Sequence, residues 1–141
     1  MSLEQGDFFG TALAMNGGQD ARGVYHEPSV LAIGRFEQAS ANTQNGAVDV
    51  FRLDAHGNWG EAETLRASDG CRVDEYGIAV AISPDGSVLM VGATQHSWSE
   101  AETPFGKAYI YEYDGGQWIE TAVLTGDPNT CRTTCMFGAA V

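Results

Sequence analysis

The acidic side chains are the first candidates for chemistry in this sequence. Asp7 and Asp74 each stand two residues before an aromatic-Gly pair, and two carboxylates acting together can hydrolyse glycosidic bonds. Cys135 takes the equivalent place before a third such pair. A carboxylate that recurs with a repeat is more simply a turn or cap acceptor. We therefore interpret both acids as structural.

The histidines and the motif content give no catalytic site either. His26, His56 and His96 are scattered, with no spacing suited to a metal site or a catalytic triad. The sequence contains no Gly-x-Ser-x-Gly elbow and no glycine-rich phosphate loop. We therefore predict that the chain is not an enzyme, and a hydrolase ranks last among its candidate functions.

Three cysteines precede the aromatic-Gly pairs. Cys71 and Cys131 are each followed by Arg, and Cys135 is additional. A disulfide between Cys131 and Cys135 and one between Cys71 and Cys131 both remain open, because sequence alone does not fix connectivity. The odd count leaves at least one thiol unpaired within the chain. Zinc is not favoured, because it takes four ligands.

The cysteines, histidines and acids are carried by a repeat. Aromatic-Gly pairs stand at Phe9-Gly10, Tyr76-Gly77 and Phe137-Gly138, so the spacings are 67 (76 − 9) and 61 (137 − 76) residues. The stretches 46–54 and 106–114 also align, as do 30–34 with 88–92 and 59–65 with 118–124. Periods of this length, built only from strand-like segments, are typical of β-propellers or related arrays.

Four apolar segments per copy read as strands, since Val, Ile, Tyr and Phe dominate them and Gly, Pro, Asn and Asp separate them. They are 9–16, 30–34, 47–54 and 59–66 in the first copy, and 76–83, 87–93, 107–114 and 117–125 in the second, with a ninth at 137–141. No window carries a helical pattern. We predict an all-β chain, a single unit over 1–141, with one sheet in 6–67, a second in 74–126 and the first strand of a third in 136–141.

Composition limits the partners. The chain has 19 acidic and 7 basic side chains and a net charge of −12, which repels phosphate backbones and makes nucleic-acid binding improbable. No apolar run approaches the roughly 20 residues that span a bilayer, so we expect no membrane insertion. The first residues lack the basic and apolar regions of a signal peptide. We interpret the chain as trimmed from a secreted or cell-surface protein.

These features together resemble the FG-GAP repeat, which is found in the β-propeller of integrin α subunits. The resemblance rests on the aromatic-Gly openings, on VLAIG and VLMVGA at 30–34 and 88–93, on the Gly-opened third strands, and on the closing Trp-x5-Leu. It covers nearly the whole chain from Gly6. Thr94 stands where the family's Gly-Ala is followed by Pro.

The resemblance implies four-stranded antiparallel propeller blades whose first strand lies nearest the axis, so the chain would hold two blades and the first strand of a third. The repeated residues would then serve packing between blades: Phe9, Gly10, Trp59, Tyr76, Gly77, Trp118, Phe137 and Gly138. Closed propellers have typically four to eight blades. Three ways to complete the ring stay open: a longer chain, homo-oligomerisation, or pairing of the last strand with the open blade of another chain.

Some members of the family bind calcium in the loop between the first and second strands. Calcium needs six to eight oxygen ligands. The first such loop here offers Asn16, Asp20 and Glu27 but lacks alternating acids, and its counterpart, Ser83–Gly86, is a bare turn. We therefore predict no calcium site and no other cofactor.

The loops differ between copies while the strands repeat, so the loops are the candidate contact surface. Long loops on a rigid scaffold often carry binding function. The candidate ligand-binding residues lie in two of them: Tyr25, His26 and Glu27 in the first, and His96, Trp98 and Phe105 in the second. We expect a binding or adhesion module for a protein or carbohydrate ligand. The alternative is a purely structural repeat.

Overall fold

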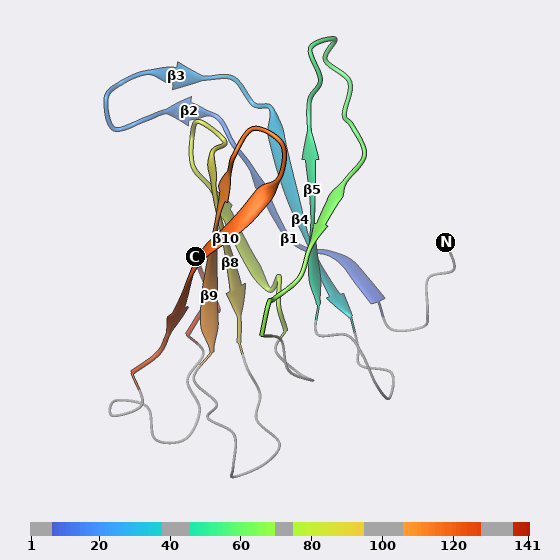
Figure 1. Cartoon of the computed structure of the whole chain (residues 1–141), viewed down its shortest axis with the longest axis vertical. Coiled ribbons are helices and arrows are strands. Elements are labelled where there is room, and N and C mark those ends of the chain that lie inside the picture. Colours follow the sequence, from blue (N-terminus) through green and yellow to red (C-terminus); the bar gives the residue numbers. More distant parts are fainter. Residues whose placement is uncertain (1–6, 38–45, 70–74, 95–105, 128–136) are drawn as a thin grey trace.

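Two four-stranded antiparallel sheets and one small hairpin make up the computed structural model (Figure 1). It describes residues 7–37, 46–69, 75–94, 106–127 and 137–141. Sheet 1 has the order β1-β4-β5-β6, and sheet 2 the order β7-β8-β9-β10. The strands of sheet 1 are β1 (Asp7–Met15), β4 (Val30–Glu37), β5 (Ala47–Arg52) and β6 (Glu63–Leu65). Those of sheet 2 are β7 (Ala79–Ile82), β8 (Val88–Ala93), β9 (Lys107–Tyr113) and β10 (Trp118–Thr125).

The all-β prediction is confirmed, because no helix occurs among the residues described. It follows that this part of the chain has no helix able to cross a membrane. Each sheet is an antiparallel meander in which consecutive strands pair, apart from the hairpin inserted in sheet 1. The two sheets do not close into a ring.

The structure corrects the sequence prediction at three places. The first is an unpredicted hairpin, β2 (Gly18–Gln19) with β3 (Tyr25–His26), between β1 and β4. The second is β6, which is only three residues long although 59–66 was predicted. The third is at the two later aromatic-Gly pairs: the strand predicted at 76–83 is only β7, over Ala79–Ile82, and the segment 137–141 is a turn without strand pairing among the described residues.

The core lies between the two sheets, and β7 packs against β1 and β4. Sheet 1 contributes Val30, Ala32, Val48 and Val50, while sheet 2 contributes Leu89, Val91 and Tyr109, all almost fully buried. These residues alternate along their strands because successive side chains point to opposite faces of a sheet. One face of each sheet therefore forms the core and the other turns away from it.

The second aromatic-Gly pair forms the joint between the sheets. Tyr76 is fully buried, its ring packs edge-on against Tyr109 at 5.2 Å, and its backbone bridges Gly46 of sheet 1. Gly77 has φ +89°, and a Cβ there would lie 2.6 Å from the Ala47 carbonyl oxygen. Only glycine fits this close approach at positive φ.

Two glycines of sheet 1 leave room for the turn at Tyr76-Gly77. A Cβ at Gly34 would overlap the Gly77 carbonyl oxygen, and one at Gly46 would overlap that of Tyr76. Tyr76-Gly77 thus packs between the two sheets. We call Gly34 and Gly46 the glycine socket of sheet 1.

The third pair repeats this contact on sheet 2. A Cβ at Gly92 would overlap the Gly138 carbonyl oxygen, and one at Gly106 would overlap that of Phe137. Gly92 and Gly106 therefore form the glycine socket of sheet 2. Residues 137–141 dock there as a turn beside β8 and β9 (Figure 1), and Phe137 remains 39% exposed.

The first pair has no sheet to dock on within the described residues. Phe9 is 56% exposed, and nothing lies within 4 Å of a Cβ placed at Gly10. Gly10 instead lies where the pairing of β1 with β4 shifts register, between Phe9 and Ala12. The predicted packing role of Phe9 between sheets is therefore not met within this chain.

The two tryptophans differ in the same way. Trp118 is 6% exposed and its ring lies 5.4 Å from that of Tyr113. Trp59, at the equivalent position of sheet 1, is 45% exposed. Within the described residues, a sheet precedes Trp118 but not Trp59, and the Trp118 backbone N–H donates to the Glu63 carboxylate of that preceding sheet at 3.0 Å.

Thr94, the departure from the family pattern, also serves the joint. It is 5% exposed, and its hydroxyl donates to the carboxylate of Glu75, the residue before Tyr76. Glu75 has φ +46°, which is uncommon for a residue with a side chain. The hydrogen bond thus holds the backbone that leads into the buried Tyr76.

We predict that Gly34→Ala destabilises the chain by about 3 kcal/mol, because the new Cβ has backbone rather than a movable side chain in its way. Gly60→Ala is the matched control, since a Cβ there would meet only the Arg52 carbonyl oxygen at 3.5 Å. Urea unfolding followed by circular dichroism measures both. Equal losses would contradict the socket.

Candidate binding surface

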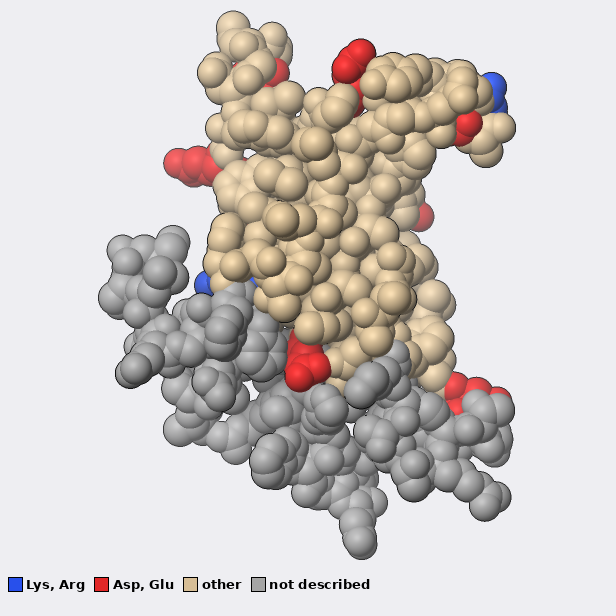
Figure 2. Space-filling view, turned by 180° about the vertical axis from the view of Figure 1, so that it is seen from behind, with Lys and Arg blue, Asp and Glu red and all other residues tan. Residues whose placement is uncertain are grey.

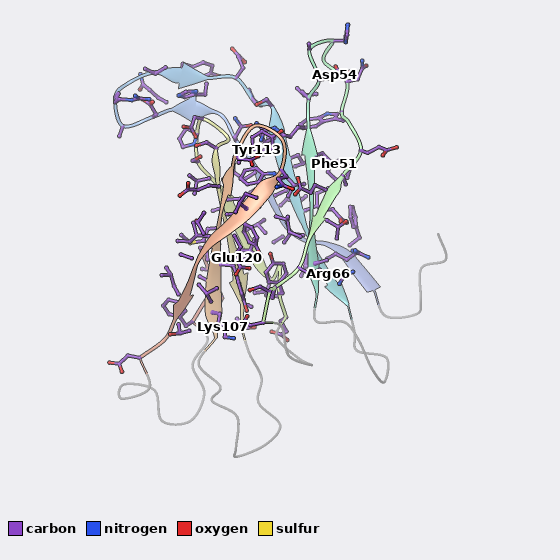
Figure 3. All side chains as sticks on the ribbon, in the orientation of Figure 1. Phe51, Asp54, Arg66, Lys107, Tyr113 and Glu120 are labelled. Carbon is purple, nitrogen blue, oxygen red and sulfur yellow. The ribbon has the colours of Figure 1, made fainter. Side chains whose placement is uncertain are left out.

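The β2–β3 hairpin is the element that distinguishes sheet 1 from sheet 2. It lies at one end of the sheets, where sheet 2 has only the short turn through Ser83–Gly86 (Figure 1). The turns β5–β6 and β9–β10 leave from the same end. Labelled side chains mark the two ends, with Asp54 at the hairpin end and Lys107 at the other (Figure 3). We call the hairpin and these three turns the hairpin end.

Asp20 organises the tip of the hairpin. Its Oδ1 accepts the backbone N–H groups of Arg22 and Val24, each at 2.9 Å. Its Oδ2 faces the Arg22 guanidinium at 3.0 Å and His26 Nε2 at 3.3 Å. The hydrogen bond from Val24 is the largest influence that lowers the pKa of this carboxyl, to about 2. One ionised carboxylate therefore fixes the loop from residue 20 to residue 26.

Asn16 holds the base of the hairpin and is 4% exposed. Its Oδ1 accepts the N–H groups of Ser29 and Val30, both at 2.7 Å. Its Nδ2 donates to the Pro84 carbonyl at 3.1 Å, which belongs to sheet 2. A single buried side chain thus ties the hairpin to the strand that follows it and to the neighbouring sheet.

Three of the candidate ligand-binding residues sit together on this hairpin. Tyr25 is 65% exposed and stands beside Val24, which is 48% exposed. His26 is half-buried against Asp20. Glu27 follows β3, and its carbonyl accepts from Asn16 at 3.4 Å. The structure thus gives Tyr25 a free ring and gives His26 a supporting role.

The other three candidates, His96, Trp98 and Phe105, lie outside the described residues. The strands on either side are β8, which ends at Ala93, and β9, which begins at Lys107. Both of these strand ends are at the opposite end of the sheets from the hairpin (Figure 3). The two loops that sequence grouped as one surface therefore leave the sheets at opposite ends, because successive strands are antiparallel.

The other three aspartates of the hairpin end close turns. Asp54 accepts the N–H groups of His56 and Asn58, at 2.8 and 2.9 Å. Asp114 accepts those of Gly116 and Gln117, both at 3.0 Å. Asp85 accepts the hydroxyls of Ser83 and Ser87, at 2.6 and 2.7 Å. Each carboxylate has a local backbone or hydroxyl donor, as expected for Asp in turns.

These hydrogen bonds involve side chains that were considered as calcium ligands in the sequence. Asn16 and Asp20, two of the oxygen donors considered for calcium, direct their side-chain oxygens at backbone N–H groups of the hairpin. Within the described ranges, no three His, Cys, Asp or Glu side chains come close enough to hold a metal ion. On the face seen in Figure 2, acidic side chains are scattered around the margin of the described surface.

Sequence reasoning missed the residues that brace the hairpin end. Arg52 lies with its guanidinium carbon 3.8 Å from the centre of the Tyr113 ring and donates to the Gly86 carbonyl at 3.2 Å. It therefore links the end of β5 to the β7–β8 turn and to the end of β9 in sheet 2. The available sequence signal at Asn16 was a polar residue directly before two glycines, and at Asp20 it was an aspartate within a loop.

Two tyrosine hydroxyls buried between the sheets form a network rather than a reactive site. The Tyr76 hydroxyl donates to that of Tyr111 at 2.7 Å, and Tyr111 reaches Glu120 at 3.2 Å. Burial raises the pKa of both phenols far above the ordinary value. Neutral, hydrogen-bonded phenols in this position stabilise the joint between the sheets.

The turn carboxylates predict acid sensitivity. The pKa of Asp20 and that of Asp85 are each lowered to about 2, the latter first by the Ser83 hydroxyl. A folded pKa below the ordinary 3.8 stabilises the fold above that pH, and the stabilisation is lost as pH falls towards 2. We expect the melting temperature to drop across this window, and to drop less steeply in the double variant Asp20→Asn, Asp85→Asn.

Glu61→Gln is the control for that experiment. It removes one negative charge, against two in the double variant, from an exposed position in the β5–β6 turn. Its melting temperature should follow the wild-type slope between pH 4 and pH 2. A double variant that matches the wild type over the same range would contradict the role of these carboxylates.

Comparisons with known proteins agree with the repeat. Residues 59–111 match a family model described as FG-GAP repeat. The match begins at Trp59, before β6, and runs through β7 and β8 to Tyr111 in β9, so it spans the joint at Tyr76-Gly77. No curated protein and no solved structure matched the chain. The resemblance seen in the sequence is confirmed over this part of the chain, because residues 59–111 are similar to the FG-GAP repeat.

Proposed function

We propose that the chain is part of an FG-GAP-type β-propeller that acts as a non-catalytic binding module. Its two sheets are two blades, and residues 137–141 lie where a further blade would pack on sheet 2. Ligand contact is made at the hairpin end, and the ligand is a protein or a glycan at the cell surface or outside the cell, as in adhesion.

The observation that carries this proposal is the hairpin itself. It is an addition to one of two otherwise equivalent sheets, and buried or ionised polar groups hold it in place. Loops that are held rigidly lose less conformational entropy on binding. At its tip the hairpin presents the exposed Tyr25 beside Val24, and an exposed aromatic residue on a fixed support is the usual anchor of a recognition surface.

A second candidate function is a structural repeat that completes a larger assembly. It is favoured by exposed apolar residues on the outer face of sheet 1, such as Leu13 and Met15, which are 65% and 57% exposed. The two functions use different surfaces, because one uses the turns at the strand ends and the other uses the faces of the sheets. Variants at each surface separate them.

Binding to arrays of oligosaccharides and of extracellular-matrix proteins tests the first function. We expect Tyr25→Ala to weaken binding at least about tenfold, since anchor aromatics contribute about 2 kcal/mol or more. Its melting temperature should stay unchanged because the ring is exposed. Leu13→Ala is the matched control, being as exposed but on a sheet face. Absence of any array signal, or equal binding by Tyr25→Ala, would contradict the proposal.

A further inference from the structure

An apolar face of sheet 1 is turned away from the core. Strand register places Leu13 opposite Ile33, and Met15 opposite Leu31, which in turn lies opposite Phe51. Leu13 and Met15 are more than half exposed, and the other three are half-buried. Monomeric proteins rarely leave such a contiguous apolar face open. We call these five residues face A.

The equivalents of face A in sheet 2 belong to the core of the molecule. Leu31 and Ile33 correspond to Leu89 and Val91, which are both fully buried against sheet 1. Leu13 and Met15 correspond to Val80 and Ile82, which pack against the same core. The same positions are thus covered in the second copy and uncovered in the first.

Sheet 2 leaves the complementary face open. Its outward side chains Val88, Met90 and Ile110 are half-buried, and Leu124 is 42% exposed. We call these four residues face B. Their equivalents in sheet 1 are Val30, Ala32, Val50 and Leu65, between 0% and 7% exposed in the core. The internal interface therefore joins a B-type face of sheet 1 to an A-type face of sheet 2, and one unused face of each type remains.

We infer that a second copy of this chain covers these faces, with face A of one copy packed on face B of the next. This contact would repeat the interface between sheet 1 and sheet 2, because faces A and B are of the same two types as the faces that meet there. Asp49, beside face A, forms an ion pair with Arg35 at 3.5 Å and accepts the Thr64 hydroxyl at 2.6 Å, so this carboxylate is already engaged before docking. This association concerns the sheet faces and is independent of ligand binding at the hairpin end.

Such a contact is heterologous, because it joins two different surfaces. Repetition of a heterologous contact generates a ring if the rotation closes and a filament if it does not. Three copies would bring together six sheets, within the typical range for propellers.

The glycine socket of sheet 2 sets the condition for docking. In the internal interface Tyr76-Gly77 fills the socket of sheet 1, so Phe9-Gly10 of an incoming copy would need that of sheet 2. Phe137-Gly138 already occupies it. Because Phe137 is 39% exposed while Tyr76 is fully buried, the segment 137–141 is the less firmly held occupant. Docking of a whole sheet therefore displaces it.

Sedimentation velocity of the full chain from about 1 to about 100 μM tests the inference. We expect reversible association that is weakened at least tenfold by Leu13→Glu on face A, and equally by Leu124→Glu on face B. Mixing these two variants should restore one contact and give a one-to-one dimer. Val24→Glu, at an exposed apolar position of the hairpin, should associate like the wild type.

Gly138→Val should strengthen association, whereas the face variants weaken it. The side chain cannot enter the socket, because a Cβ there overlaps the Lys107 carbonyl oxygen, so the socket opens and association strengthens severalfold. Circular dichroism confirms that each variant is folded. A monomeric wild type throughout this range, self-association of either face variant alone with the affinity of the wild type, or weakened association in Gly138→Val would overturn the inference.

Discussion

The structure depends on one close contact, in which an aromatic-Gly turn lies against the backbone of the preceding sheet. The backbones approach so closely that there is no room for a Cβ at Gly77 in the turn, or at Gly34 and Gly46 in sheet 1. Glycine at Gly34 and Gly46 supplies the space, and the buried ring of Tyr76 supplies the apolar contact. Close packing of this kind tolerates little change of volume. Glycine is therefore required on both sides of the contact: in the turn, at Gly77, and in the socket of the preceding sheet, at Gly34 and Gly46.

That contact also determines where functional variation is tolerated. It fixes sheet 2 against sheet 1 near one end of the strands, where Gly46 begins the approach to β5 and Thr94 follows β8. At the hairpin end the sheets are joined by side chains instead, through Asn16 to Pro84 and through Arg52 to Gly86. An insertion such as the β2–β3 hairpin leaves the repeated backbone contact intact. We therefore proposed recognition at the hairpin end and association through the faces as separate properties.

Much of this fold was predictable from the sequence, and the failures have physical causes. Alternation and turn residues identified all eight strands of the two sheets, because burial on one face imposes a period of two. The prediction of a strand at 137–141 was wrong because an apolar pattern expresses only strand propensity, whereas a strand also needs a hydrogen-bonded partner strand. The hairpin was missed because β2 and β3 have two residues each, too short for any pattern. Tyr25 was identified as a loop aromatic, but the bracing by Asp20 and Asn16 depends on backbone N–H groups that sequence does not position.

The central claim is that the aromatic-Gly pair stabilises the chain only where a preceding sheet receives it. Urea unfolding of Phe9→Ala and Tyr76→Ala at low micromolar concentration tests this most directly, since the two residues occupy equivalent positions of the repeat. We predict a loss of about 3–5 kcal/mol for Tyr76→Ala, whose side chain is fully buried. Phe9→Ala should lose less than about 1 kcal/mol, because Phe9 is 56% exposed. Equal losses at the two positions would contradict the account.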